Sequence, residues 1–513
     1  MEAGRCPGHL AVGEFPEAAA TKPSRILERS PCMLNLEPKK VWEHFERLSA
    51  IPRPSKHEKA AGDYVVSVAK ARGLEWERDE VGNVVIRVPA TKGHEKAAIT
   101  ILQGHLDMVC EKNSGTVHDF LKDPIRLRVE GNVVKAEGTT LGADNGIGVA
   151  MSLALLDEAQ AVHGPLELLF TIDEETGLNG ANNLKPGFVK GMRLLNLDTE
   201  EDGQLYVGCA GGIDTLMNLR VGRRRQKSRQ PAFKVSVTGL RGGHSGGDIH
   251  EGRGNANRIL VRFLQEMDRL SIGYELVAIQ GGSKRNAIPR EAFALLHLKK
   301  AAADEATSAL KAFQAVIRDE LKGVDDGVTM AFEEARSDMA PLSPGSQKKT
   351  VRLLGAVPHG LIAYSREIHG LVETSTNFAI VTTTQGKVQV ATSQRSSVAS
   401  QLAWAAQLVA NVGLLAGAQV VQSDGYPGWK PNLDSPILKA AQKTFLRVTG
   451  KEPQPKAIHA GLECGIIGAK YPGMDMVSLG PEIRNAHSPD EELHIDSVKR
   501  TYAVLLELLK DLA

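Results

Sequence analysis

The chain is organised around one short stretch, Gly104-His105-Leu106-Asp107-Met108-Val109. It follows Ala97-Ala98-Ile99-Thr100-Ile101-Leu102, an apolar and β-branched run that predicts a buried strand. Because side-chain direction repeats every two residues in extended chain, His105 and Asp107 can project the same way. His105 could then offer a ring nitrogen to a metal while Asp107 fixes its tautomer. Taken alone, the pair favours an ordinary hydrogen-bonded histidine near a strand end.

Acidic residues occupy similar places further along the chain. They follow predicted strands or open predicted helices: Asp144 before the helix 147–157, Glu174 and Glu175 after the strand 166–172, and Asp198 after the strand 192–197. Each has a simpler explanation by itself, since Asp144 can cap a helix and the adjacent glutamates can be a solvated pair. Together with His105 they supply most of the ligands that two divalent cations need.

One more histidine would complete such a set. His487 is the best candidate, because it follows the predicted buried strand 475–479. The adjacent Glu174 and Glu175 suit a division of labour, in which one binds a metal and the other moves a proton.

Composition excludes several other classes of protein. The chain has 513 residues, 42% hydrophobic and 24% charged, which is ordinary for a soluble globular protein of two or more domains. The net charge of +1 gives no general reason to expect nucleic acid or a membrane surface as a partner. No stretch is apolar for the roughly 18 residues that a membrane span needs. The five cysteines show no CxxC spacing, which favours a reducing, cytoplasmic location.

The order of predicted elements indicates an α/β fold with an insertion. Residues 1–32 lack the apolar core of a secretory signal and are predicted to be a disordered leader. Strands alternate with helices over 33–211 and again over 424–513, which predicts one catalytic domain with ligands at the strand ends. Residues 212–423 have the pattern of strands and amphipathic helices of an α+β domain inserted into it.

His244 lies in this predicted inserted domain, in Arg241-Gly242-Gly243-His244-Ser245-Gly246-Gly247. The glycines allow the histidine to reach a substrate, but on the residues alone a tight turn is the favoured interpretation. No GxGxxG after a strand and no GxxxxGK[ST] occurs, so a nucleotide site is unsupported.

Longer motifs give the chain a family resemblance from about residue 33 to the end. The stretches that carry it include Gly104–Val109, Gly138–Gly146, Glu174–Gly177, Leu197–Glu200, Gly242–Gly247, Arg285–Arg290, His459–Gly465 and His487–Glu491. The chain resembles the aminoacyl-histidine dipeptidases, members of the two-zinc exopeptidase family that includes carnosinase and the glutamate carboxypeptidases. The resemblance implies a zinc-exopeptidase-like catalytic domain with a lid that binds substrate or mediates dimerisation.

The resemblance also implies roles for particular residues. It assigns His105 and Asp198 to one zinc ion, Glu175 and His487 to the other, and Asp144 to both, with a cis peptide bond after Asp144. Asp107 would orient the His105 ring, and Glu174 would be the general base. In the inserted domain, which would act as a lid, His244 would stabilise the oxyanion. Asn286 and Arg395 would hold the substrate, and Arg395 would bind the carboxylate of the substrate.

The expected function is therefore hydrolysis of unblocked dipeptides, Xaa-His and others, by a cytoplasmic enzyme that can form a homodimer. It would use two zinc ions per subunit, for which cobalt or manganese could substitute. One alternative is a related dizinc deacylase or carboxypeptidase acting on N-acyl amino acids. The other is a catalytically silent, metal-dependent binding protein, against which the intact Glu174 argues.

Overall fold

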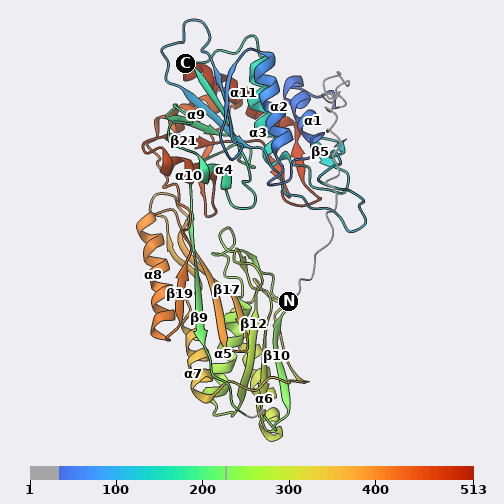
Figure 1. The fold of residues 1–513 in the computed structure, drawn as a ribbon, viewed down its shortest axis with the longest axis vertical. Helices are drawn as coiled ribbons and strands as arrows, with labels where there is room; N and C mark the ends of the chain where they lie inside the picture. The colour runs from blue at the N-terminus through green and yellow to red at the C-terminus, as the bar shows by residue number, and fades with distance from the viewer. Residues whose placement is uncertain (1–33, 226–227) are drawn as a thin grey trace, which may run out of the picture.

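The computed structural model describes residues 34–225 and 228–513, so the predicted leader lies outside the described residues. These residues form two bodies stacked along the long axis of the molecule (Figure 1). No helix in the described part of the chain is long and apolar enough to cross a membrane.

The first body is built on an eight-stranded sheet in the order β1-β2-β6-β3-β7-β21-β8-β20. Its strands are β1 Glu75–Arg78, β2 Val84–Val88, β3 Thr100–His105, β6 Leu166–Thr171, β7 Arg193–Asn196, β8 Gln204–Cys209, β20 Gln454–Ile458 and β21 Asp475–Ser478. Strands β6, β3, β7 and β21 are parallel neighbours, so their carboxyl ends meet at one edge. Ligands bind at this edge in open α/β sheets.

Helices cover both faces of this sheet. They are α1 Lys39–Ser49, α2 Lys59–Ala71, α3 Ala143–Ala154, α4 Asn179–Asn183, α9 Pro436–Thr449, α10 Glu463–Lys470 and α11 Ile495–Asp511, with the short 3-10 helix η1 Leu155–Asp157 after α3. Alternate strand residues face opposite cores: Leu102 packs with α1, α3 and α11, whereas Ile101 packs with α4 and α10. Burial on both faces explains why the strands read as continuous apolar runs.

A small sheet, β22-β23-β5-β4, carries the loop that contains His487. Its strands are β4 Leu127–Glu130, β5 Val133–Ala136, β22 Ile483–Arg484 and β23 Glu492–His494. Because β22 pairs with β23, both ends of residues 485–491 are fixed.

The second body is a nine-stranded sheet in the order β15-β10-β14-β12-β17-β18-β9-β19, with β16 paired to β17. Its strands are β9 Gly211–Arg220, β10 Ala232–Thr238, β12 Glu275–Gly281, β14 Ala292–His297, β15 Thr329–Ala335, β16 Gly360–Tyr364, β17 Val372–Thr383, β18 Lys387–Ser396 and β19 Gln419–Gln422. Its helices are α5 Ala256–Arg269, α6 Lys300–Glu320, α7 Pro344–Ala356 and α8 Ala399–Leu415. A separate two-stranded ladder joins β11, Gly243–His244, to β13, Ala287–Ile288.

Two chain crossings connect the bodies and pair with each other. Cys209 and Trp429 exchange two backbone hydrogen bonds of 2.9 Å, and Gly212 and Tyr426 exchange two more of 3.0 and 2.9 Å. Every strand of the second large sheet falls within 211–422, close to the range for which the sequence predicts an insertion.

The α/β prediction is confirmed, although some boundaries differ. The strand expected at 97–102 is Thr100–His105, so His105 ends the strand instead of following it. The helix expected at 147–157 begins at Ala143 and passes into η1.

Candidate active site

His105 and Asp198 meet at the carboxyl edge of the first sheet because β3 and β7 are parallel neighbours. The Nε2 atom of His105 lies 3.3 Å from Oδ1 of Asp198 and 3.0 Å from Oδ1 of Asp144. His105 is buried, as is nearly all of the Asp198 side chain. These three residues form one group of potential metal ligands.

His487 and Glu175 form a second group with the other oxygen of Asp144. The Nε2 atom of His487 lies 2.9 Å from Oδ2 of Asp144 and 3.2 Å from Oε2 of Glu175. Asp144 therefore presents one carboxylate oxygen to each group, which is the arrangement expected of a bridging ligand. All five predicted metal ligands are brought together.

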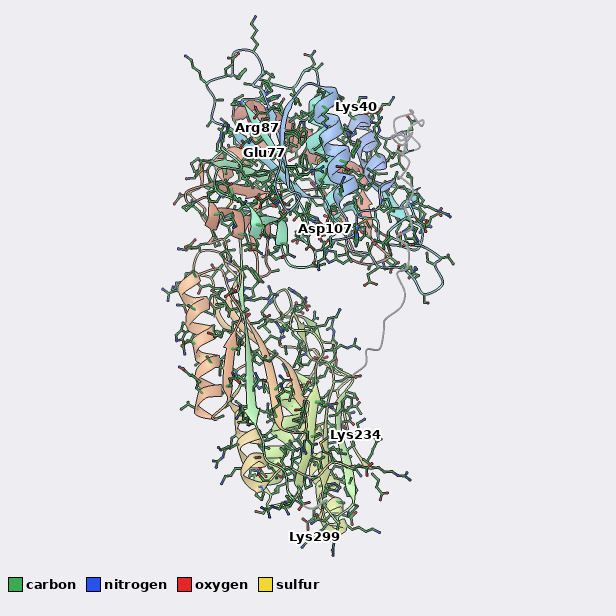
Figure 2. The ribbon with its side chains drawn as sticks, viewed as in Figure 1. Lys40, Glu77, Arg87, Asp107, Lys234 and Lys299 are labelled. Atoms are coloured by element: carbon green, nitrogen blue, oxygen red, sulfur yellow. The ribbon has the colours of Figure 1, made fainter. Side chains whose placement is uncertain are left out.

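Asp107 lies behind His105 and fixes its orientation. Its Oδ1 is 3.3 Å from Nδ1 of His105, and its two oxygens accept the backbone N–H groups of Glu174 and Glu175 at 3.0 and 3.1 Å. Although burial opposes ionisation, these hydrogen bonds and the His105 charge lower the pKa of Asp107 to about 2. Figure 2 places Asp107 at the end of the first body that faces the second.

The turn that carries Asp144 is held by two residues that the sequence analysis missed. The buried carboxylate of Glu491 accepts the backbone N–H groups of Leu141, Gly142 and Ala143 at 2.8, 3.0 and 2.8 Å. The buried Arg53 donates to the carbonyl of Gly142 in this turn at 2.5 Å and to the carbonyl of Asp107 at 2.7 Å. As the resemblance implies, the peptide bond after Asp144 is cis.

The donor set fits divalent cations. Burial and the neighbouring Asp144 carboxylate raise the pKa of Asp198 to about 7. One oxygen each of Asp198 and Glu175 is buried and has no hydrogen-bond partner among the described residues. A buried carboxylate oxygen without a hydrogen-bond partner is unfavourable, and coordination of a cation would satisfy both oxygens.

Glu174 lies beside this cluster. One carboxylate oxygen of Glu174, one of Glu175 and a ring nitrogen of His105 all lie within 4.8 Å of one another. Burial raises the pKa of Glu174 well above the ordinary value, and the nearby Asp198, Glu175 and Glu463 carboxylates add to the effect. Glu463 accepts hydrogen bonds from Gln103 and Thr171 at 2.6 and 2.7 Å. Like Glu491, it lies in one of the motifs but received no role in the sequence analysis.

In the second body, the surroundings of His244 determine its tautomer. Its Nδ1 atom accepts the backbone N–H groups of Gly246 and Gly247 at 3.3 and 3.0 Å, so the ring proton must be on Nε2. Burial and the nearby Arg395 charge lower the pKa of His244 to about 4. The ring is therefore a neutral N–H donor near pH 7.

Arg395 and Asn286 lie on the same body as His244. The Arg395 side chain is only 7% exposed, yet its one hydrogen bond within the described residues goes to the hydroxyl of Tyr426, at 2.8 Å, and no acid pairs with it there. Such a guanidinium is suited to a carboxylate brought by a ligand. Asn286 is exposed and precedes β13, which pairs with the strand of His244. In the described part of the chain, no hydrogen bond joins these three residues to the metal-ligand cluster.

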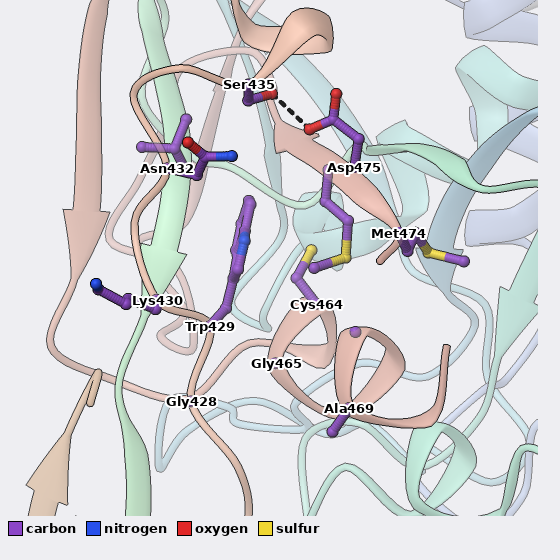
Figure 3. A pocket seen from close by; sticks show the side chains of 13 residues that line it. Gly428, Trp429, Lys430, Asn432, Ser435, Cys464, Gly465, Ala469, Met474 and Asp475 are labelled. Carbon is purple, nitrogen blue, oxygen red and sulfur yellow. Dashed lines mark hydrogen bonds between the residues drawn. The ribbon is translucent and has the colours of Figure 1, made fainter. Parts of the chain in front are cut away.

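A pocket of about 310 Å³ lies elsewhere, beside the chain crossing at Trp429 and along α10 (Figure 3). Cys464 and Met476 line it. The indole of Trp429 stands between Cys464 and Asn432. It contains none of the predicted site residues, so the polar cluster remains the candidate site.

Comparison with known proteins gives four matches. The sequence profile of Peptidase family M20/M25/M40 matches residues 101–511. The chain is 44% identical over 481 residues to the cytosol non-specific dipeptidase of Escherichia coli (strain K12), covering 93% of this chain and 98% of that protein. It also resembles the crystal structure of aminoacylhistidine dipeptidase from Vibrio alginolyticus, with TM-score 0.84, 42% identity, and coverage of 93% and 97%. A tripeptidase from Staphylococcus aureus shares the fold, with TM-score 0.55, 17% identity, and coverage of 93% and 99%.

Proposed function

The chain belongs to Peptidase family M20/M25/M40, and from this premise we propose the reaction and the roles of its residues. It is a metallo-dipeptidase, as the extent of similarity to two dipeptidases over nearly the whole chain indicates. The substrate class that we propose is unblocked dipeptides, Xaa-His among them. The observation that carries the assignment is the pair of ligand groups that share Asp144.

We assign two zinc ions to these groups, with cobalt or manganese as substitutes. His105 and Asp198 would hold one ion, Glu175 and His487 the other, and Asp144 both. Such a pair of cations supplies Lewis-acid polarisation of the peptide carbonyl and lowers the pKa of the attacking water.

Glu174 is the proposed general base. It takes a proton from the attacking water and later delivers it to the leaving amine, a role that suits a buried carboxyl group of raised pKa. Asp107 holds the backbone N–H groups of Glu174 and Glu175, so it fixes the base and a metal ligand through one carboxylate.

The second body would act as a lid that completes the site. The Nε2–H group of His244 donates to the oxygen that becomes negative as the carbonyl carbon is attacked. Arg395 binds the substrate carboxylate, and Asn286 contributes a further polar contact. An enzyme that needs these contacts should discriminate strongly between a dipeptide and its amide.

Hydrolysis of a dipeptide panel, with metal analysis of the purified protein, tests this function. We expect two zinc ions per chain and turnover of free dipeptides. Faster cleavage of N-acetyl amino acids would instead identify a deacylase or carboxypeptidase. Binding of dipeptides with no product in a single-turnover assay would identify a silent binding protein.

We also propose that the protein works in the cytoplasm and forms a homodimer. The E. coli relative is named as a cytosol enzyme. Helix α8 has no charged residue and exposes Trp404, Leu408 and Leu415 beside the edge strand β19. A second copy could pair at this edge about a two-fold axis. Sedimentation should show a dimer, and Trp404→Glu a monomer.

A further inference from the structure

A short segment of the first body, His459–Gly461, is docked against the second body. It follows β20 and leads into α10. The Nε2 atom of His459 lies 2.8 Å from the hydroxyl oxygen of Ser375, a buried residue of β17 in the second sheet. This hydrogen bond joins the two bodies outside their two chain crossings.

The residues beneath the segment form one row across the second sheet. Ser375 is paired in register with Arg395, and Arg395 with Gly212. Tyr426 continues the row through its backbone hydrogen bonds with Gly212. Its ring is so close to Gly461 that a methyl group added there would lie 2.9 Å from a ring carbon. The segment therefore contacts residues on both sides of the proposed carboxylate-binding arginine.

The same segment fixes the loop that carries His244. Gly246 packs so tightly on His459 that a methyl group added at Gly246 would overlap the carbonyl oxygen of His459. The N–H group of Gly246 is one of the two donors to Nδ1 of His244. The backbone of His459 thus bears directly on the placement of the proposed oxyanion donor.

The other end of the segment reaches the metal site. Glu463, the first residue of α10, binds Gln103 on β3 and Thr171 on β6. These strands end at His105 and just before the Glu174–Glu175 turn. A run of only a few residues therefore connects the contact with the second body to the floor of the metal cluster.

From this geometry, and resting on the proposed hydrolysis, we propose that His459 is a positioning residue for catalysis. Its segment holds the second body where His244 can reach the developing oxyanion. No hydrogen bond in the described residues ties His244 to the metal cluster, so its reach depends on how the bodies dock. A misplacement of about 1 Å can lower a rate about 100-fold.

Gly246→Ala tests this idea without removing any functional group. The added methyl group would overlap the carbonyl oxygen of His459 and lie 3.1 Å from Cε1 of His244, so it displaces the His244 loop. We expect kcat to fall about 100-fold, more than KM rises, with metal content unchanged. Gly247→Ala is the matched control. Neither glycine has a positive φ, and a methyl group at Gly247 would meet nothing nearer than Nδ1 of His244, at 3.7 Å. The loss of kcat in Gly247→Ala should therefore be at least about tenfold smaller than the loss in Gly246→Ala.

A double-mutant cycle with His244→Ala separates positioning from general damage. If the docking acts through His244, the kcat of the double variant should be less than about threefold below the kcat of His244→Ala alone. The proposal would be overturned if the kcat losses of the two single variants multiplied in the double variant, or if Gly246→Ala alone kept the kcat of the parent. Ser375→Ala removes the hydroxyl bonded to His459 and lies outside the His244 loop. It is carried through the same cycle, so the test does not depend on the direct contact between Gly246 and His244.

The proposed function is tested separately by two measurements within this set. Absence of dipeptide turnover in the parent, or a parental kcat in His244→Ala, contradicts the reaction or the role of His244. Normal turnover with a strong His244→Ala effect, but no coupling to Gly246 or Ser375, contradicts only the docking role of His459.

Discussion

The metal cluster and the group around His244 and Arg395 differ in what holds them. All the proposed metal ligands lie in the first body, where Asp107 supports His105 and Glu491 holds the Asp144 turn. His244 is held by its own loop, and Arg395 by one tyrosine at the chain crossing. The first body can therefore assemble its ligands alone, whereas the lid residues act only if the two bodies are correctly docked.

Removing the shared ligand should have the largest effect. We expect Asp144→Ala to lose at least one metal ion and essentially all activity, more than any other single ligand variant. The metal ions of a two-metal site typically lie about 3.5–4 Å apart, and without Asp144 they would lack the negative charge that offsets their mutual repulsion. Metal analysis after dialysis is the measurement, and two tightly retained zinc ions would rule out the bridge.

Glu174→Gln should separate chemistry from metal binding within the first body. The amide keeps the shape of the side chain but cannot accept a proton, so kcat should fall by ~100- to 10,000-fold while both metals stay bound. Steady-state kinetics on metal-replete protein checks this. Near-parental turnover would remove the base assignment.

His244→Ala is the corresponding test of the second body. Loss of one oxyanion donor typically lowers kcat by about 100- to 1,000-fold, with a smaller change in KM. Metal content and thermal unfolding should match the parent, since His244 supports neither. A kcat within a few-fold of the parent would mean that the histidine only shapes its turn.

Arg395→Ala should act mainly on binding. Losing the carboxylate partner weakens the ground-state complex, so KM for a dipeptide should rise by at least about tenfold. A dipeptide amide provides the control, because its KM should hardly change. Equal effects on both substrates would contradict the carboxylate contact.

The smallest expected effect concerns pH. A pKa of about 4 keeps His244 neutral above about pH 5, whereas an ordinary histidine would titrate near pH 6.5. The ratio of parent kcat to His244→Ala kcat should therefore stay constant between pH 6 and 8. A ratio that changes across pH 6.5 would show that the ring gains a proton there.

Apolar runs in the sequence predicted the presence of strands correctly, but not where the strands end. β3 runs on through Gly104 and His105, which pair with Phe170 and Thr171 although the apolar run has ended. Gly104 is required there because the Asn145 side chain occupies the space that a methyl group would need. No strand was expected at 211–220, where β9 is stabilised by β18 on one side and β19 on the other.

The candidate site shows the same division. Residue types and their places predicted His105 and Asp198 at strand ends and Asp144 at a helix start as ligands. Parallel strands bring the first two to one edge of the sheet. Glu491 and His459 received no role. Their significance arises from contacts with residues far away in the sequence, the Asp144 turn and Ser375.

The sequence by itself determined the α/β class, the family resemblance and the chemical inventory, because periodicity, motifs and ligand types are properties of local sequence. Only the tertiary structure decided that Asp144 turns one oxygen to each ligand group and that Nδ1 of His244 accepts backbone N–H groups. It alone also placed His459 against the second body. These features depend on distances between segments that only the packing of the chain brings together.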